Sequence, residues 1–193
     1  MLLILEGIEG TGKTTLAKAI ERDLMFIRYR PFTWEGPRLT SDELAAWSQL
    51  GIQANTYVED IYAADMLAAL SRRHPVRVVL DRSLPSGIVY SSLSDDQAIK
   101  LMEKWSLLVK AASGIIIHLT GDVSVLRERA LVTRAQDQSQ RTIELMESRQ
   151  RRLVDIMSVL SENVPKFTID ASKESADNVY SRVRLLCHQA WGL

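Results

Sequence analysis

The chain has 193 residues, of which 46% are hydrophobic and 25% are charged, and 24 basic residues balance 24 acidic ones. This composition predicts a single globular domain, 1–193, and excludes a mainly disordered chain. Zero net charge excludes a chain-wide attraction to nucleic acid but leaves a local basic patch open. The single cysteine, Cys187, cannot form an internal disulfide, and the apolar run 1–5 is too short to span a membrane. We therefore expect a cytoplasmic protein with no membrane partner, or one in the host cytoplasm if the source is viral.

Short apolar runs alternate with longer helical patterns along the chain. The expected strands are 2–6, 25–30, 76–80, 115–119 and 167–169. The expected helices are 14–24, one that begins at Ser41, 56–73 and 175–191, and the proline-containing segment 31–40 reads as a loop. Continuous apolar strands separated by helices indicate a parallel sheet that is buried on both faces. The predicted fold is a three-layer α/β domain.

A phosphate-binding motif follows the first predicted strand. Residues 7–14 read Gly-Ile-Glu-Gly-Thr-Gly-Lys-Thr, which matches the Walker A pattern in full and opens a predicted helix. Glycines let backbone N–H groups turn toward phosphate oxygens, and the helix adds the positive end of its dipole. Lys13 should reach the β- and γ-phosphates, and the Thr14 hydroxyl should bind Mg²⁺. The expected contacts of the bound nucleoside triphosphate are Gly7, Glu9, Gly10, Thr11, Gly12, Lys13, Thr14 and Thr15.

The rest of the chain narrows the class of P-loop protein. A GTP switch needs an Asn-Lys-x-Asp motif, but Asn55, Asn163 and Asn178 are followed by Thr, Val and Val. Motor and multi-subunit ATPase domains are normally longer. A compact P-loop chain with neither feature is most often a small-molecule kinase, whose acceptor lies over the carboxyl ends of the strands.

A second motif, Asp81-Arg82-Ser83, follows the strand predicted at 76–80. A carboxylate at that edge of the sheet can hold Mg²⁺-bound water or accept a proton from the attacking group. The guanidinium of Arg82 can hold an anionic acceptor through two parallel hydrogen bonds. We therefore predict that Asp81 is a metal or proton site and that Arg82 orients the acceptor.

Three motifs occur in the order and at the spacing of a known family: residues 7–15, then Tyr62-Ala63-Ala64-Asp65, then Asp81-Arg82-Ser83-x-x-Ser86-x-x-x-Tyr90. They resemble the thymidylate kinase family, with the deoxynucleoside kinases as next of kin. The resemblance implies a P-loop NTPase fold with a five-stranded parallel sheet, Mg-ATP as donor and a mobile helical lid. It places Asp65, Ser86 and Tyr90 near the acceptor, and Arg30 and Trp34 lie in the segment that would cover it.

The implied lid is 126–141, which contains Arg127, Arg129, Arg134 and Arg141. The segment Gly10-Thr11 supplies no arginine, so charge on the migrating phosphoryl group must be neutralised from the lid. Arg129 and Arg134 are the candidates for that role.

The acceptor half departs from the family pattern. Met66 stands where the family has Arg, Ser91 stands where it has Gln, and its Arg-Glu-Pro loop is not recognisable. The expected reaction is phosphoryl transfer from Mg-ATP to a deoxypyrimidine nucleotide. The alternatives are phosphorylation of the hydroxymethyl group of 5-hydroxymethyluracil in phage DNA, a deoxynucleoside kinase, and a nucleotide-binding protein without turnover. A homodimer is left open.

Other titratable residues are expected to be structural. His118 should be a buried, hydrogen-bonded strand residue, and Cys187 should be a small packing residue. Arg149, Arg151 and Arg152 share a predicted helix with acidic residues, which indicates a salt-bridged face exposed to solvent.

Overall fold

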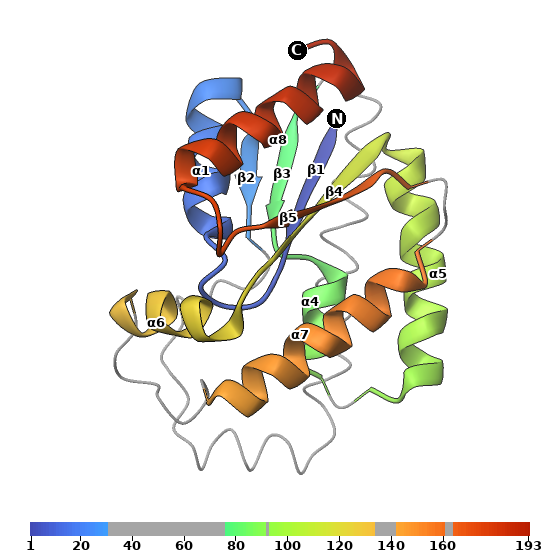
Figure 1. The fold of residues 1–193 in the computed structure, drawn as a ribbon. Coiled ribbons are helices and arrows are strands. Elements are labelled where there is room, and N and C mark those ends of the chain that lie inside the picture. Colours follow the sequence, from blue (N-terminus) through green and yellow to red (C-terminus); the bar gives the residue numbers. More distant parts are fainter. Residues whose placement is uncertain (31–75, 92, 134–141, 161–163) are drawn as a thin grey trace, which may run out of the picture.

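A computed structural model describes residues 1–30, 76–91, 93–133, 142–160 and 164–193 (Figure 1). Its five strands form one parallel sheet in the order β2-β3-β1-β4-β5. Their bounds are β1 (Leu2–Glu6), β2 (Ile27–Tyr29), β3 (Val78–Asp81), β4 (Gly114–Thr120) and β5 (Lys166–Asp170). The predicted five-stranded parallel sheet is therefore confirmed, with each strand within a few residues of its expected place. The loop expected at 31–40 and the helices expected from Ser41 and over 56–73 lie outside the described residues.

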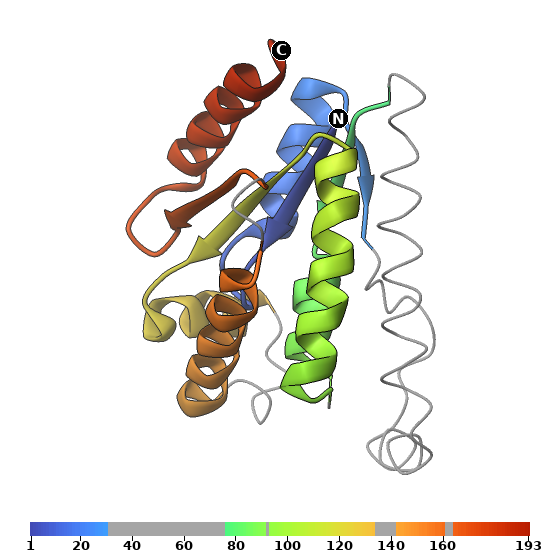
Figure 2. The same cartoon turned by 90° about the vertical axis from the view of Figure 1, so that its right-hand side faces the viewer.

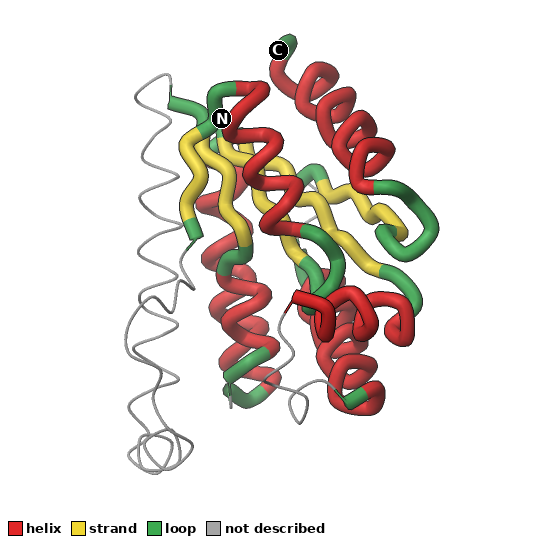
Figure 3. Tube along the Cα trace, turned by 90° about the vertical axis from the view of Figure 1, so that its left-hand side faces the viewer, coloured by secondary structure: helices red, strands yellow, loops and turns green. Residues whose placement is uncertain are grey.

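Helices cover both faces of the sheet, which confirms the three predicted layers. Figure 3 shows α1 (Lys13–Leu24) and α8 (Ala176–Trp191) on one face. Figure 2 shows α5 (Asp95–Ala111) and α7 (Ile143–Ser158) on the other face, where α4 (Leu84–Val89) also packs. None of the helices in the described parts of the chain is long and apolar enough to cross a bilayer.

The two cores follow from the alternation of side chains along the strands. In β1, Leu3 and Leu5 join the core under α1 and α8, whereas Leu2 and Ile4 join the core under α4, α5 and α7. Serine and threonine side chains cap the starts of three helices by accepting backbone N–H bonds: Ser94 for α5, Thr142 for α7 and Ser175 for α8. This packing fixes the strand ends that carry the polar residues.

Among the described residues, the remaining helix is α6 (Val123–Thr133), which lies at the carboxyl edge of the sheet, whereas both ends of the chain lie at the opposite edge (Figure 1). Leu126 of α6 is fully buried and packs with Ile8, Val123 and Met146. The first part of the expected lid, 126–133, therefore belongs to α6. Residues 134–141, including Arg134 and Arg141, lie outside the described residues.

Candidate active site

The loop between β1 and α1 has the backbone that its glycines predict. Gly10 and Gly12 have φ of 78° and 83°, in the left-handed region that other residues avoid. A Cβ atom on Gly10 would lie 1.9 Å from the carbonyl oxygen of Leu126, so only glycine fits against α6. No side chain in the described part of the chain caps the start of α1 at Gly12. The first-turn N–H groups of α1 are thus placed to bind an anion.

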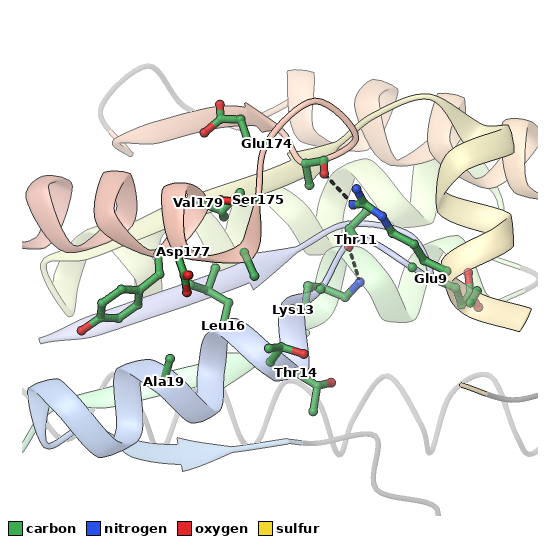
Figure 4. Close-up of a pocket in the computed structure, with 18 of the residues that line it drawn as sticks. Glu9, Thr11, Lys13, Thr14, Leu16, Ala19, Glu174, Ser175, Asp177 and Val179 are labelled. Carbon is green, nitrogen blue, oxygen red and sulfur yellow. Dashed lines mark hydrogen bonds between the residues drawn. The ribbon is translucent and has the colours of Figure 1, made fainter. Parts of the chain in front are cut away.

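Lys13 is buried inside this loop, as Figure 4 shows. Its ammonium donates to the Ile8 carbonyl at 2.5 Å and to the Thr11 hydroxyl at 2.9 Å. Burial, and then the positive charge of Arg82, lower the pKa of Lys13 to about 7, although nearby carboxylates oppose the shift. The loop therefore encloses a positive group that an anionic ligand would stabilise.

Asp81 is the last residue of β3 and is completely buried. It pairs in register with Leu5 of β1, beside the phosphate loop. Neither carboxylate oxygen accepts a hydrogen bond from any described residue, and Arg30 lies with Nε 3.6 Å from Oδ2. A buried carboxylate is unfavourable unless it is paired or coordinates a metal. Asp81 is therefore suited to hold a cation in addition to Arg30, whose ion pair leaves both carboxylate oxygens without a hydrogen bond from the described residues.

The residues present fit Mg²⁺. The described residues contain no cluster of three or more His, Cys, Asp or Glu side chains around a metal-sized space. Mg²⁺ does not need such a cluster, because it is usually bound by one or two carboxylates together with phosphates and water. Thr14 lines the adjoining cleft and adds a hydroxyl oxygen.

Two guanidinium groups contact the ring of Tyr90. The Cζ atom of Arg82 lies 5.3 Å from the ring centroid, and that of Arg149 lies 4.7 Å from it. Nη1 of Arg149 is also 3.6 Å from Oε1 of Glu9. Burial opposes the shift, but the neighbouring Tyr90 hydroxyl and Glu9 carboxylate hold the pKa of Arg82 above its usual value. The four side chains form one charged cluster between the phosphate loop, β3 and α7.

Arg149 corrects the sequence-based expectation of a solvent-exposed face. Its side chain is only 15% exposed and contacts Glu9 and Tyr90 across the site. Charge periodicity on a helix shows which residues share a face but does not show what that face packs against. The expectation failed for Arg149 because its side of α7 turns toward the phosphate loop, whereas Arg151 is exposed as expected.

A second network, which the sequence motifs did not indicate, surrounds Glu6 at the end of β1. Its fully buried carboxylate accepts hydrogen bonds from Ser83 N at 2.7 Å, Ser83 Oγ at 2.8 Å and Ser86 Oγ at 2.5 Å. Burial raises the pKa of Glu6, and the serine hydrogen bonds and nearby cations oppose that rise. Ser86, expected near the acceptor, here donates to Glu6. The only signal for this role in the sequence is an acidic residue that ends an otherwise apolar strand.

A cleft of about 850 Å³ runs from the phosphate loop toward α8 (Figure 4). This volume suits a small-molecule ligand. Glu9, Gly10, Thr11, Gly12, Lys13, Thr14 and Thr15 all line it, together with Arg30, Arg82 and Arg129. Arg129 donates from Nη1 to the Ala171 carbonyl at 2.6 Å, which ties α6 to the loop after β5. The structure therefore brings most of the predicted nucleotide contacts to one cleft.

Gly7 directly follows β1 and packs so closely that a Cβ atom would lie 2.3 Å from the Leu119 carbonyl oxygen. Trp34, Asp65 and Arg134 lie outside the described residues. His118 is buried as predicted, but its Nε2 atom has no hydrogen-bond partner among the described residues, contrary to the expected bonding. Burial raises the pKa of the Cys187 thiol to about 12, in agreement with a packing role.

Comparisons with known proteins agree with this geometry, although no family model matches the chain. A probable thymidylate kinase of Methanocaldococcus jannaschii is 24% identical over 195 residues, covering 95% of this chain and 93% of that protein. The chain is a kinase that resembles thymidylate kinases. The predicted resemblance and enzyme class are thereby confirmed.

Solved structures confirm the predicted P-loop fold of this kinase. YorR of Bacillus subtilis, in complex with phosphorylated GDP, has a TM-score of 0.65 at 17% identity, with 97% of this chain and 96% of that chain covered. Deoxyadenosine kinase of M. mycoides with bound dATP has a TM-score of 0.65 at 14% identity, with 96% and 99% covered. Since these identities are low, the two structures support the fold alone.

Proposed function

We propose that this kinase transfers the γ-phosphate of Mg-ATP to a deoxypyrimidine nucleotide. The observation that carries the proposal is the fully buried Asp81 carboxylate beside the phosphate loop, with no hydrogen bond from any described residue. Its ion pair with Arg30, at 3.6 Å, leaves both oxygens without a hydrogen bond from those residues, and a bound Mg²⁺ would supply a further positive partner for this buried charge. The intact loop around Lys13 supports a triphosphate donor.

Each residue then has a chemical role. Lys13 and the N–H groups at the start of α1 bind the phosphate tail of the donor. Thr14 and Asp81 would hold Mg²⁺, which neutralises phosphate charge when it is bound. Arg82 orients the acceptor, and Arg129 and Arg134 stabilise the charge that moves with the phosphoryl group. Lid closure over 126–141 would exclude water and limit hydrolysis of the donor.

The charges around the acceptor side favour an anionic acceptor. Arg30, Arg82 and Arg149 bring three guanidinium groups to this side, where Glu9 and Asp81 supply the opposing carboxylates. With Lys13 there are four positive groups, and with the buried Glu6 there are three carboxylates, so the positive groups still outnumber the negative ones. This balance favours a phosphate-bearing acceptor. A deoxynucleoside is the second candidate, since deoxyadenosine kinase shares the fold at a TM-score of 0.65.

An acceptor screen with γ-labelled ATP and Mg²⁺ tests the proposal. It compares deoxynucleoside monophosphates, deoxynucleosides, and DNA with or without 5-hydroxymethyluracil. We expect label on thymidine or another deoxypyrimidine monophosphate. Label only on nucleosides would favour the deoxynucleoside kinase, and label only on modified DNA would favour the DNA kinase. ATP binding without transfer to any acceptor would contradict a kinase of this kind and favour a nucleotide-binding protein.

The lowered pKa of Lys13, about 7, predicts a pH dependence of ATP binding. Above that pH the ligand-free lysine loses its proton, whereas bound phosphates favour the charged form. Binding must then take up a proton, so affinity should weaken between about pH 7.5 and about pH 9. Calorimetry in buffers of different ionisation enthalpy measures both the affinity and the proton uptake. Lys13→Met should bind weakly with no such uptake; equal uptake in both proteins would contradict the prediction.

A further inference from the structure

Glu6 occupies an unusual position for a charged side chain. It ends the central strand β1, is fully buried, and directly precedes Gly7 of the phosphate loop. A carboxylate is rarely buried unless specific partners hold it, because its desolvation is strongly unfavourable. Neither the predicted donor contacts nor the predicted acceptor contacts use Glu6. The role of Glu6 must therefore be inferred from the residues that its carboxylate contacts.

Among the described residues, the hydrogen bonds to the Glu6 carboxylate come from the segment that follows β3. Oε1 accepts from both the backbone N–H and the hydroxyl of Ser83, at 2.7 and 2.8 Å. Oε2 accepts from the hydroxyl of Ser86 at 2.5 Å. Ser83 and Ser86 are themselves buried. One side chain thus joins the end of the strand that carries the donor loop to the turn that carries Asp81 and Arg82.

The turn that Glu6 holds contains a strained residue. Arg82 has φ of 81°, in the left-handed region that is unfavourable for a side chain larger than glycine. On one side its N–H donates to the Leu5 carbonyl at 3.1 Å. On the other side the next N–H, that of Ser83, donates to Glu6. The two hydrogen bonds clamp the turn from both sides, which allows the strained conformation to persist.

This conformation aims the guanidinium group of Arg82. From the clamped turn, its Cζ atom reaches 5.3 Å from the Tyr90 ring centroid, and the residue lines the large cleft. We propose that Glu6 is a positioning residue, whose bonds to Ser83 and Ser86 hold the backbone of Arg82 in the conformation that directs its guanidinium group to the acceptor. The activity measurements below rest on the proposed function, whereas the structural measurement does not.

A double-mutant cycle separates positioning from a general role in stability. Displacing an orienting group by about 1 Å can lower a rate about 100-fold, so we expect Glu6→Ala to lower kcat/KM for the acceptor by about that factor. The dissociation constant of ATP should change much less. If Glu6 acts through Arg82, the variant with both Glu6→Ala and Arg82→Ala should be no slower than Arg82→Ala alone. If the two losses multiply, the proposal is wrong.

Conservative variants provide the rescue and the control. Glu6→Gln can still accept from Ser83 and can donate to the Ser86 hydroxyl, so it should retain most of the activity that Glu6→Ala loses. Ser106→Ala is the control for changes to this network, because Ser106 is a buried serine like Ser83 and Ser86. Its hydroxyl donates within α5, to the Glu103 carbonyl at 2.8 Å, and not to Glu6. Ser106→Ala should lower the melting temperature without changing kcat/KM. Loss of activity in Glu6→Gln equal to that in Glu6→Ala would contradict positioning by this network.

Crystal structures give a readout that needs no activity. In Glu6→Ala, Arg82 should leave the left-handed region and lose its contact with Tyr90; an unchanged Arg82 would overturn the proposal. If Glu6→Ala does not fold, Ser86→Ala tests the same network with one hydrogen bond removed, by the same cycle and the same structural comparison. If the wild-type protein transfers phosphate to no acceptor, the proposed function fails and the structures alone decide the role of Glu6.

Discussion

Lys13→Met is expected to lower the rate of phosphoryl transfer by about 10²–10³-fold, the usual effect of removing one preorganised donor to a transition-state charge. The ammonium of Lys13 is buried in the loop that should hold the triphosphate, where it donates to the Ile8 carbonyl. Single-turnover transfer of labelled phosphate measures the loss, and ATP titration measures the accompanying loss of affinity.

The same variant should not be less stable than the wild-type protein. Burial lowers the pKa of Lys13 to about 7, so at neutral pH the unfolded chain binds this proton more tightly than the folded protein does. Burying the charged lysine therefore lowers the free energy of unfolding. This penalty is complete below about pH 7 and is relieved as the pH rises above that value. Methionine fills the space without a charge. Lys18→Met, on the exposed face of α1, is the control and should leave transfer unchanged. Full activity in Lys13→Met would remove the basis for a donor site at this loop.

Asp81→Asn is expected to lower transfer by about 10²–10⁴-fold, the range for a positioned general base. The amide has nearly the same shape as the carboxylate but carries no charge for Mg²⁺ and cannot accept a proton at neutral pH. ATP binding without Mg²⁺ should change little, whereas the Mg²⁺ concentration needed for half-maximal activity should rise.

The control for this substitution is Asp155→Asn, which removes a carboxylate from the exposed surface of α7. It should have no effect on transfer or on the Mg²⁺ requirement. If Asp81→Asn keeps its Mg²⁺ requirement and loses only transfer, Asp81 acts on the acceptor and is not a metal ligand. If it loses neither, the proposed role of the buried carboxylate is wrong.

The sequence was sufficient for the parts of the fold and the site that depend on local pattern. The apolar run before Gly7 could only be a buried strand, and the glycine spacing after it requires a loop that opens a helix at Lys13. Asp81 follows the next strong apolar run, so its place at the carboxyl edge follows from the parallel sheet. Each of these features depends on residues that are close together in the sequence, so the spacing of residue types is enough to predict it.

Contacts between elements that are far apart in the sequence could not be predicted from the spacing of residues. The helical charge pattern around Arg149 is the same whether α7 faces solvent or the phosphate loop, and the structure places Arg149 against Tyr90. The serines of the Asp81 motif are compatible with an acceptor contact or with a bond to the protein, and only the packing of β1 against β3 brings them to Glu6. Residues that act across elements need the three-dimensional structure to be found.

The close approach of Gly10 to the Leu126 carbonyl couples the position of the phosphate loop to that of α6. With no side chain between them, the backbone of the phosphate loop rests directly on the buried side of α6. A displacement of α6 would therefore displace the loop as well. A triphosphate bound in the loop would in turn restrain α6, because such coupling acts equally in both directions.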